Sequence, residues 1–153
     1  MTKRLLKVVY VHPSRYDDEG YVVRYWRGVL PSNTLFCLKA LTERVAEADE
    51  LDKDVTVAVE GYHDAVERVP ISRLARQNRR KNTQIVVGLV GVQSNQFARA
   101  TDLALEMRER GIPVVIGGFH VSGILALYDK PSPELQHLID HGVSLIKGEV
   151  EAP

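Results

Sequence analysis

The sequence predicts an α/β fold in which five parallel strands form one sheet with helices on both of its faces. Five short apolar runs rich in Val and Ile alternate with segments of helical periodicity, a pattern typical of strands buried between two layers of helices. The chain has 153 residues, 44% of them hydrophobic, a length typical of one domain with a complete core. We therefore expect a single domain over residues 1–153.

The strands are expected at the apolar runs 5–12, 55–60, 84–92, 113–118 and 143–149. The first and third runs read LLKVVYVH and QIVVGLVGV, in which β-branched residues are frequent. The second run alternates apolar and polar residues, and the fourth, PVVIGG, ends in Gly117 and Gly118. A turn alone needs at most one glycine, so this pair indicates a place where the backbone lies against a bound molecule.

Helices are expected at residues 34–48, 70–82, 94–111 and 131–142. The first has apolar residues at positions 35, 38, 41 and 45, with Ser32 or Asn33 as its N-cap. Cys37 lies on this apolar side and is expected to be buried. The third helix begins at a capping serine, Ser94, and ends at Gly111.

A long connection, residues 13–33, follows the first strand. It contains Tyr16, Tyr21, Tyr25 and Trp26, which makes it too aromatic for a disordered segment, and a connection of this length is usually functional. Because it leaves the first strand at the edge where ligands bind in such folds, we interpret it as a lid over a ligand or as a docking surface for another domain.

The charge and cysteine content exclude several classes of function. The 20 basic residues balance the 20 acidic ones, so the net charge gives no reason to expect nucleic acid or an anionic membrane as a partner. The single cysteine permits neither a disulfide nor a cysteine-based metal cluster within the chain. We find no signal peptide and no apolar run of about 18 residues, and we therefore expect a cytoplasmic protein.

The candidate binding residues follow the strands at one edge of the sheet. In open α/β sheets, ligands bind beyond the carboxyl ends of the strands. The residues at these positions are mostly small, polar or glycine, and Ser94 begins a helix whose N-terminus can meet a phosphate. The candidates are His12, Pro13, Ser14, Gln93, Ser94, Asn95, Gln96, Gly117, Gly118, Phe119, His120, Gly148 and Glu149.

The segment VGVQSNQFARATDLALEMRERGIPVVIGGFHVS, followed by GVSLIKGEVE, resembles the cobalamin-binding domain that precedes the catalytic barrel in many radical S-adenosylmethionine enzymes. Four features carry the resemblance: a strand ending in a small polar residue, a helix closing in Gly-Ile-Pro, the strand end Val-Val-Ile-Gly-Gly-x-His, and the closing Gly-Glu-x-Glu. The resemblance extends from Lys7 to the end of the chain and is weakest between Leu51 and Asn82.

The resemblance implies a flavodoxin-like (Rossmann-like) fold that lays the corrin ring of cobalamin across the carboxyl edge of the sheet. The nucleotide tail would enter the crevice between the first and third strands. Ser94 and its neighbours would hold this tail, Gly117 and Gly118 would pass under it, and Gly148 would give clearance after the fifth strand.

The resemblance does not extend to a histidine that coordinates cobalt. Cobalamin mutases and methionine synthases have Asp-x-His-x-x-Gly after the first strand, whereas here Tyr10 precedes His12 in place of the aspartate and Arg15 follows in place of the glycine. His120 follows the wrong strand and has Gly118 in place of the aspartate. We therefore expect base-off cobalamin without a histidine ligand, and no metal-ligating residue in this chain.

The three-cysteine motif that binds the iron–sulfur cluster of the radical enzymes is missing from the sequence. The resemblance thus implies that the cluster and S-adenosylmethionine belong to a C-terminal barrel of a longer parent protein, which would be the partner of this domain. The domain alone is expected to catalyse nothing, and methyl transfer or other radical chemistry stays open for the parent enzyme.

Other functions remain open alongside this one. The same fold could lack cobalamin and serve as a substrate-binding or domain-docking module. It could also bind a flavin or a nucleotide, although no G-x-G-x-x-G follows the first strand and the chain has no P-loop. A receiver-type signalling module is disfavoured, because the third strand ends in Gly-Val-Gln-Ser without the aspartate that such modules phosphorylate.

Overall fold

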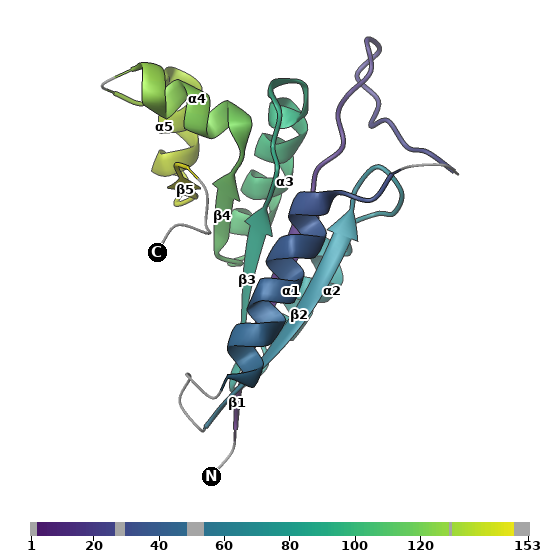
Figure 1. The fold of residues 1–153 in the computed structure, drawn as a ribbon, viewed down its shortest axis with the longest axis vertical. Coiled ribbons are helices and arrows are strands. Elements are labelled where there is room, and N and C mark those ends of the chain that lie inside the picture. The colour runs from purple at the N-terminus through teal and green to yellow at the C-terminus, as the bar shows by residue number, and fades with distance from the viewer. Residues whose placement is uncertain (1–2, 27–29, 49–53, 129, 149–153) are drawn as a thin grey trace.

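The structure is a computed structural model, which describes residues 3–26, 30–48, 54–128 and 130–148. Its five strands form one parallel sheet in the order β2-β1-β3-β4-β5 (Figure 1), which confirms the predicted flavodoxin-like α/β fold. The strands are β1 (Arg4–His12), β2 (Val55–His63), β3 (Thr83–Leu89), β4 (Val114–Gly117) and β5 (Ser144–Ile146).

Five α-helices connect the strands and cover both faces of the sheet. They are α1 (Asn33–Glu47), α2 (Ile71–Asn78), α3 (Phe97–Glu109), α4 (Phe119–Leu127) and α5 (Pro133–Asp140). A short 3₁₀ helix, Ser94–Gln96, precedes α3. In Figure 1, α1 lies in front of the sheet and α2 and α3 lie behind it. In the described residues, we find no helix that is long and apolar enough to cross a membrane.

Helix α4 was not predicted, because residues 119–127 give no sign of helical periodicity. The segment reads FHVSGILAL, in which apolar residues occupy all sides of the helix instead of one stripe. Strand β2 is longer than predicted and continues through His63, since its register with β1 extends as far as the pair His12 and His63. Predicted strand residue Glu149 lies outside the described residues.

The main core lies between the sheet and the helices α2, α3 and α5. Alternate residues of β1 and β3, such as Val9, Val11 and Val87, are fully buried there. Leu74 of α2 and Leu103 of α3 pack into the same cluster. This alternation follows from the two-residue period of a strand, in which every second side chain points to the same face.

The opposite face of the sheet is covered by α1, which packs on β1 and β2. The hydroxyl groups of Tyr10 and Thr42 are 2.8 Å apart, and this hydrogen bond fixes the helix over β1. Leu35 is buried as predicted, but Cys37 is exposed, which corrects the expectation that it is buried. The apolar pattern of α1 identifies the side that turns toward the sheet at Leu35, whereas Leu41 and Val45 of the same predicted side are 37% and 47% exposed. Near the start of the helix, Cys37 and Leu38 border a pocket.

Candidate functional site

The loops after β3 and β4 are joined by hydrogen bonds at the carboxyl edge of the sheet. The backbone nitrogen of Val92 donates to the carbonyl oxygen of Gly117 (3.2 Å), and that of His120 donates to the carbonyl oxygen of Val92 (3.1 Å). The backbone nitrogen of Gly148 donates to Ser122 Oγ at 3.1 Å, which ties the end of β5 to α4. The candidate residues that follow β3, β4 and β5 therefore share one connected surface.

A pocket of about 620 Å³ opens at this edge, between α1 and the loops after β3 and β4. It lies where the strand order reverses between β1 and β3, the place at which ligands bind in open α/β sheets. The described residues that line it carry no charged side chain and supply backbone, amide, hydroxyl, thiol and apolar groups. This α1 pocket is lined by Asn33, Thr34, Cys37, Leu38, Val90, Gly91, Gln93, Gly117, Gly118, Phe119, Ser122 and Gly148.

The two adjacent glycines at the end of β4 have different surroundings. A Cβ atom at Gly117 would meet the side chain of Ile146 at 3.6 Å, an ordinary contact distance, and would stand in the wall of the α1 pocket. Gly118 has a φ of +139° and lies directly against the backbone of the preceding loop. Packing within the fold therefore requires a glycine at position 118. Gly117 has no side chain that covers the backbone, which leaves room for a ligand there.

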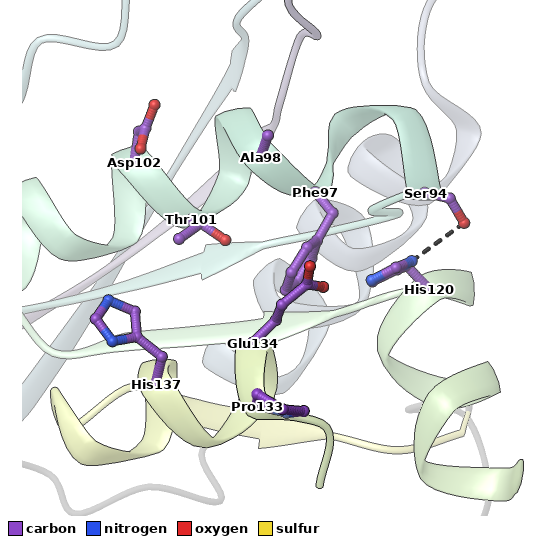
Figure 2. Close-up of a pocket in the computed structure, with 9 residues that line it drawn as sticks. All are labelled: Ser94, Phe97, Ala98, Thr101, Asp102, His120, Pro133, Glu134 and His137. Atoms are coloured by element: carbon purple, nitrogen blue, oxygen red, sulfur yellow. Dashed lines mark hydrogen bonds between the residues drawn. The ribbon is translucent and has the colours of Figure 1, made fainter.

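A second pocket, of about 690 Å³, lies between α3 and α5 (Figure 2). It contains the candidates Ser94 and His120, which Figure 2 shows on one side of the pocket, while His137 of α5 lies on the other. We call it the α3–α5 pocket. It is lined by Ser94, Phe97, Ala98, Thr101, Asp102, His120, Pro133, Glu134 and His137.

His120 is held at the edge of this second pocket by two neighbours. Its Nδ1 atom lies 3.1 Å from Ser94 Oγ, and its ring packs on Phe97 with 4.2 Å between the ring centroids. The Nε2 atom of His120 and the Oγ1 atom of Thr101 are buried and have no hydrogen-bond partner in the described residues. Buried polar atoms of this kind usually bind water or a ligand, so the pocket has unused hydrogen-bonding capacity.

Four of the candidates, Pro13, Ser14, Gln93 and Gln96, take part in contacts that hold the loops in place. The side chain of Gln96 donates to the carbonyl oxygen of Pro13 (2.9 Å) and accepts from the backbone nitrogen of Gln93 (2.9 Å). Ser14 is buried, and its hydroxyl donates to the carbonyl oxygen of Val23 at 2.5 Å. Asn95 is exposed and lines neither pocket, and Glu149 lies outside the described residues.

His12 and His63 end the adjacent strands β1 and β2 and pack against each other. Their ring centroids are 4.9 Å apart, and the Nδ1 atom of each is buried without a hydrogen-bond partner in the described residues. Burial, and secondly the charge of His63, hold the pKa of His12 below its ordinary value of 6.5. His63 lies beyond the second strand that the sequence predicts, residues 55–60, but the structure places it in β2.

The loop after β1 is held on the molecule by Asp64, a residue that the sequence analysis did not select. Asp64 is fully buried, and its carboxylate accepts two hydrogen bonds from Arg99 (2.7 and 3.1 Å) and one from Arg24 (3.3 Å). Burial opposes ionisation of Asp64, but the hydrogen bonds and charge of Arg99, assisted by Ser14 and Arg24, hold the pKa below its ordinary value. The sequence shows no signal for this role, because the predicted second strand ends at residue 60 and only the structure shows Asp64 directly after β2.

The same loop folds back as a short hairpin over α3. Tyr16 and Val22 form an antiparallel bridge, and Asp17 Oδ1 accepts from the backbone nitrogen of Tyr21 at 2.8 Å. The hydroxyl of Tyr16 donates to the carboxylate of Asp102 on α3. Residues 13–25 are thus an ordered segment beside the carboxyl edge.

The residues at the edge fit a bulky organic ligand better than a bare metal ion. In the residues that the structure describes, no group of three His, Cys, Asp or Glu side chains is arranged to hold a metal. The α1 pocket offers uncharged groups and a backbone that is bare at Gly117. Comparison of the chain with protein-family models, curated proteins and solved structures found no match.

Proposed function

We propose that this chain is a cobalamin-binding domain and that the nucleotide tail of the cofactor enters the α1 pocket. The observation that carries the proposal is the position of this pocket at the reversal of strand order between β1 and β3. Its volume of about 620 Å³ falls within the range of small-molecule sites, roughly 300–1,000 Å³. The corrin ring would lie across the loops after β3, β4 and β5.

Individual residues would have distinct tasks in this site. Gly117 would let the tail approach the backbone of β4, and Gln93 and Ser122 would offer hydrogen bonds to its polar groups. Phe119, which is 71% exposed at the pocket edge, would give the corrin an apolar contact. The chain would bind and orient the cofactor, which supplies an organocobalt centre for methyl transfer or radical chemistry when it is bound.

The catalytic chemistry would belong to another domain of a longer parent protein. A radical S-adenosylmethionine barrel needs three cysteines for its iron–sulfur cluster, and this chain has one. The proposed partner of the domain is therefore such a barrel, positioned to cover the upper face of the corrin. The residue pattern of the segment from Lys7 onward, described above, is what supports this part of the proposal.

A flavin is the alternative that the same pocket position favours, because flavodoxin-like folds bind flavin mononucleotide at this switch point. The phosphate of that cofactor is a dianion, whereas the phosphodiester of the cobalamin tail carries one negative charge. Among the described residues that line the α1 pocket, none carries a charge that would balance a dianion. This difference favours cobalamin over flavin mononucleotide.

Equilibrium dialysis of the purified chain against hydroxocobalamin tests the proposal. We expect retention with a dissociation constant of about 10 μM, weakened by the missing cover over the corrin. Gly117→Val should abolish retention, because its branched side chain would fill the pocket wall, while Ala40→Val on an exposed part of α1 should retain the cofactor like the wild type. Circular dichroism would establish that both variants are folded.

Two results would contradict the proposal. One is a folded wild-type chain that retains no cobalamin at about 100 μM, or ten times the expected dissociation constant. The other is equal retention by wild type and Gly117→Val, which would place the ligand outside the α1 pocket. Tighter retention of flavin mononucleotide than of cobalamin in the same dialysis would assign the pocket to the flavin.

A further inference from the structure

A third pocket, of about 530 Å³, lies on the other face of the sheet, between the hairpin after β1, the start of α2 and the middle of α3. It shares no lining residue with the α1 pocket or the α3–α5 pocket. Three arginines, Arg24, Arg68 and Arg99, contribute to its wall, and we call it the arginine pocket. Val69 and Leu103 add an apolar surface.

Two of the three guanidinium groups are fixed in position by the protein. Arg99 holds the carboxylate of Asp64 with two donors, Nε at 2.7 Å and Nη2 at 3.1 Å. Arg24 Nη1 donates to the carbonyl oxygens of Asp64 (2.6 Å) and Glu67 (3.1 Å). A guanidinium group has five N–H donors, so both arginines keep donors beyond those used in these contacts. Because these two side chains are already fixed in position, the binding of a ligand to them would cost little side-chain entropy.

The charges around the pocket do not cancel. The carboxylate of Asp64 faces both Arg24 and Arg99, so this buried group leaves one positive charge uncompensated. The carboxylate of Glu106, which is the one acidic group among the described residues of the wall, forms an ion pair with Arg110 at 3.0 Å. Arg68 is exposed and forms no ion pair with the described residues. The wall therefore carries an excess of two positive charges.

We propose that the arginine pocket is a second binding site, which takes a small organic anion with a phosphate or carboxylate group. Guanidinium groups bind these planar or tetrahedral oxyanions through paired N–H donors. The apolar part of the ligand would lie on Val69 and Leu103, with the ring of Tyr21 at the side of the pocket. This site is independent of the cobalamin proposal, because it lies on the face opposite α1.

Titration of the ¹⁵N-labelled chain with phenyl phosphate, followed by amide chemical shifts, tests the site. We expect saturable shifts at Ser72 and Leu103, with a dissociation constant of about 1 mM in low salt. Arg68→Gln should weaken binding about threefold to tenfold, since it removes one exposed charge without touching the Asp64 contacts. Arg76→Gln is the matched control, an exposed arginine of α2 that does not line the pocket and should bind like the wild type.

Benzylamine, which is protonated at neutral pH, serves as the ligand of opposite charge and should produce no shifts at these amides. The proposal is overturned if phenyl phosphate at about 20 mM, well above the expected dissociation constant, leaves the amides of Ser72 and Leu103 unchanged. It is also overturned if Arg68→Gln and Arg76→Gln weaken binding equally, because that result means general attraction to a basic surface. Equal binding of benzylamine would exclude an anion site.

Discussion

A Cβ atom on Gly118 would lie 2.2 Å from the backbone nitrogen of Val92 and 2.8 Å from its carbonyl oxygen. The same two loops are joined by the hydrogen bonds from Val92 to Gly117 and from His120 to Val92. The backbone at Gly118 also has a φ of +139°, a conformation that residues with a side chain rarely adopt. Gly118 therefore maintains the contact between the loops after β3 and β4. Residues of these loops line both the α1 pocket and the α3–α5 pocket.

Gly118→Ala is expected to lower the free energy of unfolding by at least about 3 kcal/mol, because the loop must move to accommodate the methyl group in a strained conformation. Gly117→Ala is the matched control, since its Cβ meets Ile146 at an ordinary distance of 3.6 Å, and it should change stability by less than about 1 kcal/mol. Urea unfolding followed by circular dichroism measures both. Equal stability of the two variants would show that the loop moves away from Gly118 at little cost in free energy.

The parts of the fold that the sequence predicted are those with a clear local pattern. The alternation of Val9 and Val11 with less buried neighbours, and the capping residue Ser32 before α1, are short-range signals that packing reinforces. Helix α4 was missed because its apolar residues lack a single stripe. Cys37 was misjudged because the periodicity of a helix identifies its apolar side but does not reveal what lies next to it.

The site residues were harder to predict, because they depend on contacts between distant parts of the chain. The rule that ligands bind at the carboxyl edge selected Gln93 and Gly117, which do line one pocket together. It could not reveal that Gln96 is used to hold the loop at Pro13. The pairing of Asp64 with Arg99 joins residues 35 positions apart, and one sequence shows no sign of such a pair.

Asp64→Asn is expected to lower the free energy of unfolding by about 3 kcal/mol, because it leaves the charges of Arg24 and Arg99 without their buried partner. The amide has the same size as the carboxyl group, so packing is preserved. Limited proteolysis should also cleave within residues 15–25 faster than in the wild type, since this loop is held by Arg24. Asp140→Asn, an exposed position at the end of α5, is the control. Unchanged stability and protease resistance would contradict this role of Asp64.

Stability should decrease as the pH falls below about 6.5. His12 has a lowered pKa in the folded protein because of its burial and the neighbouring His63, so below its ordinary value of 6.5 the unfolded chain binds more protons at this residue. Unfolding then becomes more favourable as the pH falls from 6.5 toward the lowered pKa. His12→Gln should reduce this slope in urea titrations between pH 7.5 and pH 5. An unchanged slope in His12→Gln would assign the effect to other groups.

In the proposed cobalamin complex, no histidine of this chain should coordinate cobalt. The two histidines at the carboxyl edge that the sequence selected both pack against other side chains of the protein. His120 places Nδ1 3.1 Å from Ser94 Oγ and packs its ring on Phe97, and the ring of His12 packs on His63. Turning either imidazole toward the corrin would break these contacts.

His12→Ala and His120→Ala should therefore leave the visible spectrum of bound cobalamin almost unchanged, although the second should bind cobalamin less tightly through lost packing. Electron paramagnetic resonance of the cobalt(II) form is the sharper measurement, because a nitrogen ligand splits its lines into triplets. A triplet that is present in the wild type and absent from either variant would show histidine coordination and contradict this arrangement of the edge.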